Sequence, residues 1–114
     1  MTVRFSVTLP PSVNNLYPTV RGRRIKSRAY KSWLDRAGWD IVEQLGHRPH
    51  VGGRVEVRLL VGVDHRSDID GRCKAMLDLL VTMGIIDDDC WVERLTIERA
   101  GMMGKIGVGI AAIV

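Results

Sequence analysis

Apolar and polar side chains alternate with a period of two in two stretches of the sequence. Residues 2–9 follow this pattern and end at two prolines, as expected of a half-buried strand. Residues 54–61 alternate and then become fully apolar, which indicates a strand that enters the interior of a sheet. Residues 91–97 and 105–114 are predicted to be two further strands, and the glycines between them favour a β-hairpin.

A period of three to four residues predicts two helices. The first is expected to begin near Ser27, whose hydroxyl suits the N-cap position, and to end at Leu45, just before Gly46. The second is expected to run from about Asp70, as its N-cap, to Met83. The apolar stripes of the two helices are Tyr30, Trp33, Leu34, Ala37, Ile41 and Leu45 in the first and Cys73, Met76, Leu77 and Leu80 in the second.

The order β, α, β, α, β, β predicts an α/β (α+β) fold with a four-stranded mixed sheet and two helices. The 114 residues, 12.8 kDa, leave room for one domain, so residues 1–114 are expected to form it. No apolar run has the roughly 20 residues that a membrane crossing needs. The two cysteines have neither metal-ligand spacing nor the density of a disulfide scaffold. We therefore expect a cytoplasmic protein.

Charge is distributed unevenly along the chain. Residues 1–59 hold eleven Lys and Arg against four Asp and Glu, a net +7, whereas residues 60–114 hold six against nine, a net −3. A basic segment at residues 21–31 has six cations and no acid: Arg21, Arg23, Arg24, Lys26, Arg28 and Lys31. Such a segment binds phosphates with little sequence information, so DNA is the expected partner, and a solubilising loop is the alternative.

Four polar or aromatic residues near the basic segment are further candidates for DNA contact. Tyr17 and Tyr30 flank the segment and are candidates to stack on bases opened at a DNA junction. Asn14 and Asn15 are either turn formers or phosphate-binding residues.

Seven aspartates lie within 26 residues, between positions 64 and 89, and they suggest a metal site. In an extended segment Asp68 and Asp70 project from one side of the backbone, and Lys74 follows Asp70 by one helical turn. Carboxylate oxygens suit Mg²⁺, with Mn²⁺ as a substitute. The alternative is a helix cap beside a surface ion pair.

A second acidic cluster, Asp87–Asp88–Asp89, follows the second helix and is either part of the same site or a turn. A helix from residue 70 to 83 carries the chain about 20 Å away from Asp70. Asp89 therefore rejoins the site only if residues 84–88 run back along the helix, or if a partner chain supplies it.

These residues resemble the RusA family of Holliday-junction resolvases. Residues 67–78 and 84–92 are similar to the family pattern D-x-D-N-x-x-K … D-x-L … G-x-x-x-D-D. Residues 9–17 resemble the family's opening P-P-S-x-N-x-x-Y, so the similarity extends from the first strand to about residue 99. Gly71 stands where the family commonly has Asn, which removes a side chain that could hydrogen-bond near the metal.

The resemblance implies a homodimeric, Mg²⁺-dependent endonuclease that nicks symmetrically across four-way DNA junctions and is typically encoded by bacteria or their prophages. By position Asp68, Asp70 and Asp89 take the places of the family's metal-binding acids, and Lys74 that of its essential lysine. Asp88 is a reserve ligand.

The leading hypothesis is a metal-dependent endonuclease of recombination and repair that acts on branched DNA as a homodimer. One alternative is a non-catalytic DNA-binding dimer whose acids only cap helices. Another is a small-molecule phosphohydrolase, which would not need the basic segment.

Overall fold

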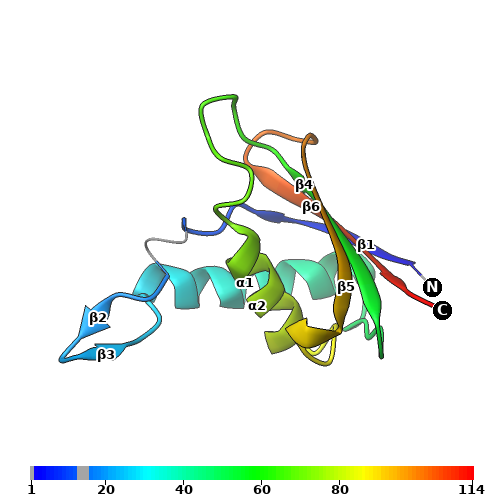
Figure 1. Cartoon of the computed structure of the whole chain (residues 1–114), viewed down its shortest axis with the longest axis horizontal. Helices are drawn as coiled ribbons and strands as arrows, with labels where there is room; N and C mark the ends of the chain where they lie inside the picture. Colours follow the sequence, from blue (N-terminus) through cyan, green and yellow to red (C-terminus); the bar gives the residue numbers. More distant parts are fainter. Residues whose placement is uncertain (1, 13–15) are drawn as a thin grey trace.

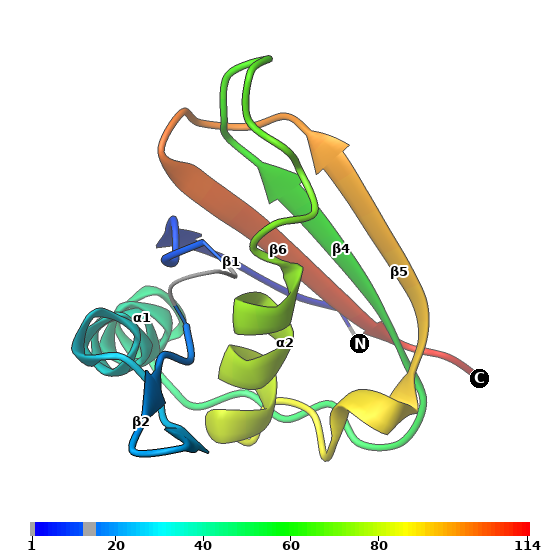
Figure 2. The same cartoon turned by 60° about the vertical axis from the view of Figure 1, so that its left-hand side comes forward.

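In the computed structural model, which describes residues 2–12 and 16–114, a four-stranded sheet carries both long helices on one face (Figure 1, Figure 2). The period-two patterns explain this layering, because they place the apolar side chains of each inner strand on the helix side. Strand β1 (Thr2–Thr8) buries every second residue, as do β4 (Val55–Val61) and β6 (Lys105–Ala112). The expected α+β fold, a four-stranded mixed sheet with two helices, is confirmed.

The sheet has the strand order β1-β6-β4-β5, in which β5 (Val92–Arg99) forms one edge. Strand β6 is antiparallel to both β1 and β4, whereas β5 is parallel to β4. In the β4–β5 pair Val55 lies opposite Val92 and Val61 opposite Arg99, so the two strands start at the same end of the sheet.

Helix α1 (Arg28–Leu45) has the ends that the sequence predicts. The Ser27 hydroxyl caps it by accepting a hydrogen bond from the Tyr30 N–H over 3.0 Å. Gly46 follows in the left-handed conformation, with φ of 75°, and its N–H bonds to the Val42 carbonyl.

Helix α2 (Cys73–Thr82) begins three residues later than predicted. The cap position belongs to Arg72, which makes no side-chain cap, so the prediction that Asp70 caps this helix is wrong. The carbonyl of Asp70 instead closes a turn with the Cys73 N–H, over 3.1 Å. The side chain of Arg72 is held outside the helix, because its Nε donates to the Pro10 carbonyl over 3.0 Å. Residues 62–72, which we call the acidic loop, thus separate β4 from α2.

The predicted hairpin between the last two strands is wrong. Strand β6 lies between β1 and β4, and β5 pairs with β4 alone. The sequences of the two strands account for their places: β5 carries charged residues that form ion pairs with β4, Arg94–Glu56 and Arg58–Glu98, and suits an exposed edge. Strand β6 has apolar residues alternating with small ones and suits the interior of the sheet.

The connection from β5 to β6 crosses over the end of β4, where Gly62 lies. The Gly62 N–H donates to the Lys105 carbonyl over 2.9 Å, and the Gly62 carbonyl accepts from the Gly104 N–H over 2.8 Å. A Cβ at Gly62 would overlap the carbonyl oxygen of Met102, so the crossing needs a glycine there.

Two smaller elements lie beside this framework. The strands β2 (Thr19–Val20) and β3 (Arg23–Arg24) form a two-stranded hairpin at the start of the basic segment, for which the sequence patterns predict no strand. Its central residues, Arg21 and Gly22, have φ of 52° and 75°, as a tight hairpin turn requires. The 3-10 helix η2 (Asp89–Trp91) leads into β5. In the described part of the chain no helix has the length and apolar character needed to cross a membrane.

Candidate functional site

Asp68 and Asp70 lie in the acidic loop, and both side chains are exposed. The loop is tied to the edge of the sheet by Arg99, whose Nη1 donates to the carbonyl oxygens of Asp64 and of Ser67, the latter over 2.9 Å. These bonds use backbone acceptors only. The two candidate carboxylates therefore face solvent, and the backbone of their loop is held to β5 by Arg99.

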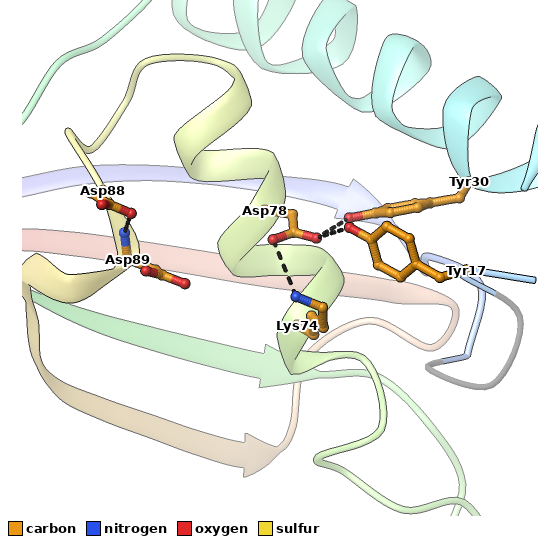
Figure 3. Close-up of polar contacts among 6 residues, drawn as sticks. All are labelled: Tyr17, Tyr30, Lys74, Asp78, Asp88 and Asp89. Carbon is orange, nitrogen blue, oxygen red and sulfur yellow. Dashed lines mark hydrogen bonds and ion pairs between the residues drawn. The ribbon is translucent and has the colours of Figure 1, made fainter. Parts of the chain in front are cut away.

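Asp78, in the middle of α2, accepts hydrogen bonds from two tyrosines. The hydroxyls of Tyr17 and Tyr30 both donate to its Oδ2, over 2.9 Å and 2.7 Å (Figure 3). The Nζ of Lys74 lies 3.8 Å from Oδ1 of the same carboxylate, one helical turn away. The ion pair of Lys74 is thus with Asp78 rather than with Asp70, which precedes the helix.

Sequence reasoning gave Asp78 no role. Two signals were available. Asp78 follows Lys74 by four residues and so lies on the same face of the helix, and it stands at the Asp of the D-x-L part of the family pattern. The two tyrosines give no such signal, since they lie 61 and 48 residues away in the sequence.

The two tyrosine hydroxyls remain protonated and so donate hydrogen bonds, because their pKa values are raised. Burial raises the pKa of Tyr30 well above its ordinary value, and the hydrogen bond to Asp78 raises it further. The same two causes, in the same order, raise the pKa of Tyr17. Tyr30 has no exposed surface, so the expectation that it stacks on DNA bases is wrong. Tyr17 is half-buried and packs edge-on against Tyr30, with ring centroids 5.7 Å apart.

The basic segment lies against this aromatic pair. The Arg24 guanidinium carbon is 5.7 Å from the centroid of the Tyr17 ring, and Lys26 Nζ is 5.8 Å from that of Tyr30. All six cations of the segment are exposed except Lys26, which is half-buried. Asn14 and Asn15 lie outside the described residues.

Two of the three aspartates at residues 87–89 form structural hydrogen bonds. Asp87 holds the turn before β4: its Oδ1 lies 2.8 Å from His50 Nε2, and its Oδ2 accepts from the Gly53 N–H over 3.3 Å. These bonds lower the pKa of Asp87, with the larger effect from His50. Asp88 caps η2 by accepting from the Asp89 N–H over 2.7 Å (Figure 3). Asp89 is exposed.

The candidate acids are attached at opposite ends of α2. The acidic loop follows the carboxyl end of β4, whereas Asp89 precedes the amino end of β5, and the two strands are parallel. The ten residues of α2 span about 15 Å between these ends. Residues 84–88 do not run back along the helix, because the Ile85 carbonyl accepts from the Val51 N–H near the start of β4.

Across residues 2–12 and 16–114 no three Asp, Glu, His or Cys side chains are grouped closely enough to hold a metal ion. The structure therefore keeps Asp68 and Asp70 together in the acidic loop but does not add Asp89 to them within one chain. At Gly71 a Cβ would meet no atom within 4 Å, so the first carbon of the family's usual Asn would meet no clash there.

The sequence of the chain matches a known protein family. The family profile described as Endodeoxyribonuclease RusA matches residues 8–111, nearly the whole chain. A search of curated proteins returned no significant match. The matched range includes the basic segment, the acidic loop, α2 and Asp89. The chain therefore belongs to the RusA endodeoxyribonuclease family.

Proposed function

We propose that this protein is a Mg²⁺-dependent endonuclease that acts as a homodimer and resolves four-way DNA junctions by paired, symmetric nicks in recombination and repair. The observation that carries the proposal is the contact between the basic segment and α2. Tyr17 and Tyr30 attach the segment to Asp78, one turn from Lys74, and the acidic loop leads into the same end of the helix. The basic segment is thus tied to the helix that carries Lys74 and that the acidic loop leads into.

The donor chemistry of the acids fits Mg²⁺, because Asp68, Asp70 and Asp89 offer exposed carboxylate oxygens. When bound, the ion would polarise the scissile phosphate and favour ionisation of the attacking water. Asp88 is the weaker candidate ligand, since one of its oxygens already caps η2. Lys74, whose side chain is 55% exposed, would orient the water or stabilise negative charge on the phosphate.

A homodimer is supported by the separation of the acids. Asp70 and Asp89 lie at the two ends of α2, so one chain offers only part of the ligand set at each end. A two-fold axis that pairs two copies of α2 in opposite directions would bring the acidic loop of one chain to Asp89 of the other. Such a dimer would also present two sites to the two related strands of a four-way junction.

The decisive experiment is a nicking assay on a synthetic four-way junction with and without Mg²⁺. We expect wild-type protein to make paired nicks only with the metal, and Asp70→Asn to bind the junction but not cut it. Asp35→Asn is the matched control, because it removes the same charge from the exposed surface of α1. Tight binding without any product would support the non-catalytic DNA-binding alternative instead.

A variant of the basic segment tests the remaining alternative. Replacing both Arg23 and Arg24 by Ala should weaken junction binding. The slope of log Kd against the logarithm of the salt concentration should fall by about two. Arg48→Ala, an exposed cation beyond the far end of α1, should change neither. If the double variant retains wild-type turnover and salt dependence, the segment is not a DNA contact, and a small-molecule phosphohydrolase becomes the better interpretation.

A further inference from the structure

The carboxylate of Asp78 joins three parts of the chain that are distant in sequence. Oδ2 accepts hydrogen bonds from the hydroxyl of Tyr17, which precedes the basic segment, and from that of Tyr30, on α1. Oδ1 faces Lys74 on α2 (Figure 3). Two hydrogen bonds on one oxygen anchor that oxygen and restrict rotation of the carboxylate, which limits the positions that the other oxygen can take.

The contact between Asp78 and Lys74 orients the ammonium group but is not a hydrogen bond, so it occupies none of the N–H groups of Lys74. The distance of 3.8 Å is longer than a hydrogen bond, so the attraction is electrostatic. The ring of Tyr17 supplies a second attraction, because its centroid lies 5.6 Å from the Nζ of Lys74. The three N–H groups of Lys74 are therefore available to a phosphate or a water molecule.

Tyr17 is fixed at the base of the basic segment. The Ser27 N–H donates to the Leu16 carbonyl over 2.9 Å, and the Ile25 N–H donates to the Pro18 carbonyl over 3.2 Å. Leu16 is fully buried, which anchors this closed base to the core. The hydrogen bond from Tyr17 to Asp78 thus connects the base of the segment to α2.

We propose that Asp78 is a positioning residue of the nuclease, which holds the ammonium of Lys74 through one oxygen and the base of the basic segment, through Tyr17, by the other. DNA bound by the segment is then aligned with Lys74. The inference rests on the proposed function, because Asp78 is proposed to position a lysine that acts on DNA. Asp78 contacts neither the metal nor the scissile phosphate in this scheme.

The test is a double-mutant cycle on single-turnover nicking of a four-way junction at saturating enzyme. Asp78→Asn keeps an acceptor oxygen for the tyrosines and replaces the oxygen that faces Lys74 by an amide donor. We expect the rate to fall between about tenfold and a hundredfold while the junction Kd changes little. In a Lys74→Ala background the same substitution should cost less than about threefold, because its effect passes through the lysine.

A merely structural role for Asp78 predicts a different result. The loss would then be equal in both backgrounds and would follow a fall in thermal stability, and equal losses would overturn the proposal. Tyr17→Phe is a second, milder variant, which removes one donor and keeps the ring. It should raise the junction Kd about fivefold, as expected for the loss of one hydrogen bond, and an unchanged Kd and rate would disprove the connection to the segment.

The same assay separates this inference from the proposed function. If wild-type protein nicks the junction and Asp78→Asn nicks it equally fast, the positioning role is wrong and the nuclease remains. If wild-type protein does not nick the junction under any metal condition, both are wrong. Asp35→Asn is again the charge-matched control and should behave as wild type.

Discussion

The hydroxyls of Tyr17 and Tyr30 provide a direct probe of the Asp78 contacts, because they are the only tyrosines in the chain. Both pKa values are raised above the ordinary 10.0, chiefly by burial. The unfolded chain releases these protons near pH 10, whereas the folded chain retains them. The resulting stability is complete below about pH 10 and is lost as the pH rises through the raised values.

We therefore predict that tyrosinate absorbance develops at higher pH in the folded protein than in the urea-unfolded chain. The free energy of unfolding, measured in urea, should fall as the pH rises above about 10, and Tyr30→Phe should reduce that fall. Titration of both hydroxyls near pH 10 in the folded protein would contradict the burial of the two hydroxyls and their hydrogen bonds to Asp78.

At the residue scale the sequence reveals functional groups that are near one another in the chain. Asp68, Asp70 and Lys74 were identified from their spacing, and the structure keeps the two acids in one loop beside the first turn of α2. Asp78 was overlooked because its partners, Tyr17 and Tyr30, come from other elements. A repeat of apolar and polar residues along the sequence cannot reveal contacts that form only when the helices pack on the sheet.

At the scale of elements, the crossing of the β5–β6 connection over the end of β4 makes Gly62 a sensitive position. We predict that Gly62→Ala destabilises the protein by about 1–3 kcal/mol or more, because the new methyl group overlaps the Met102 carbonyl. Urea unfolding followed by circular dichroism measures this change. Gly109→Ala, in β6, is the matched control, since a Cβ there meets nothing within 4 Å. Equal stability of the two variants would argue against the crossing.

The elements themselves were predicted well and their pairing was not. The periods of β1, α1 and β4 gave bounds within about two residues of those observed. The hairpin prediction failed because alternation specifies which face of a strand is buried but not which strand lies beside it. The start of α2 was predicted too early because Asp70 resembles an N-cap, whereas the Arg72 side chain is held by Pro10 on a distant segment.

At the scale of the whole molecule, the separation of Asp70 and Asp89 predicts complementation between two inactive variants. If each site takes its acids from both chains, a mixed dimer of Asp70→Asn and Asp89→Asn has one site with both substitutions and one intact site. Mixing the unfolded variants in equal amounts and refolding them should then restore about a quarter of the wild-type sites, since half of the dimers are mixed.

The product of the mixture should be junctions nicked on one strand, because each mixed dimer has a single intact site. Denaturing gels distinguish this product from the paired nicks of wild-type protein. An inactive mixture, with mixed dimers verified by mass spectrometry, would instead indicate that each chain assembles its own site.

The position of β6 has a consequence for how the protein is made. This strand follows all the others in the sequence, yet it is hydrogen-bonded on both sides and joins β1 to the β4–β5 pair. In a nascent chain on the ribosome that has not yet released residues 105–112, β1 has no partner strand and the β4–β5 pair has an unpaired edge on β4. The sheet is therefore completed only after these residues emerge, and until then these edges are open to aggregation.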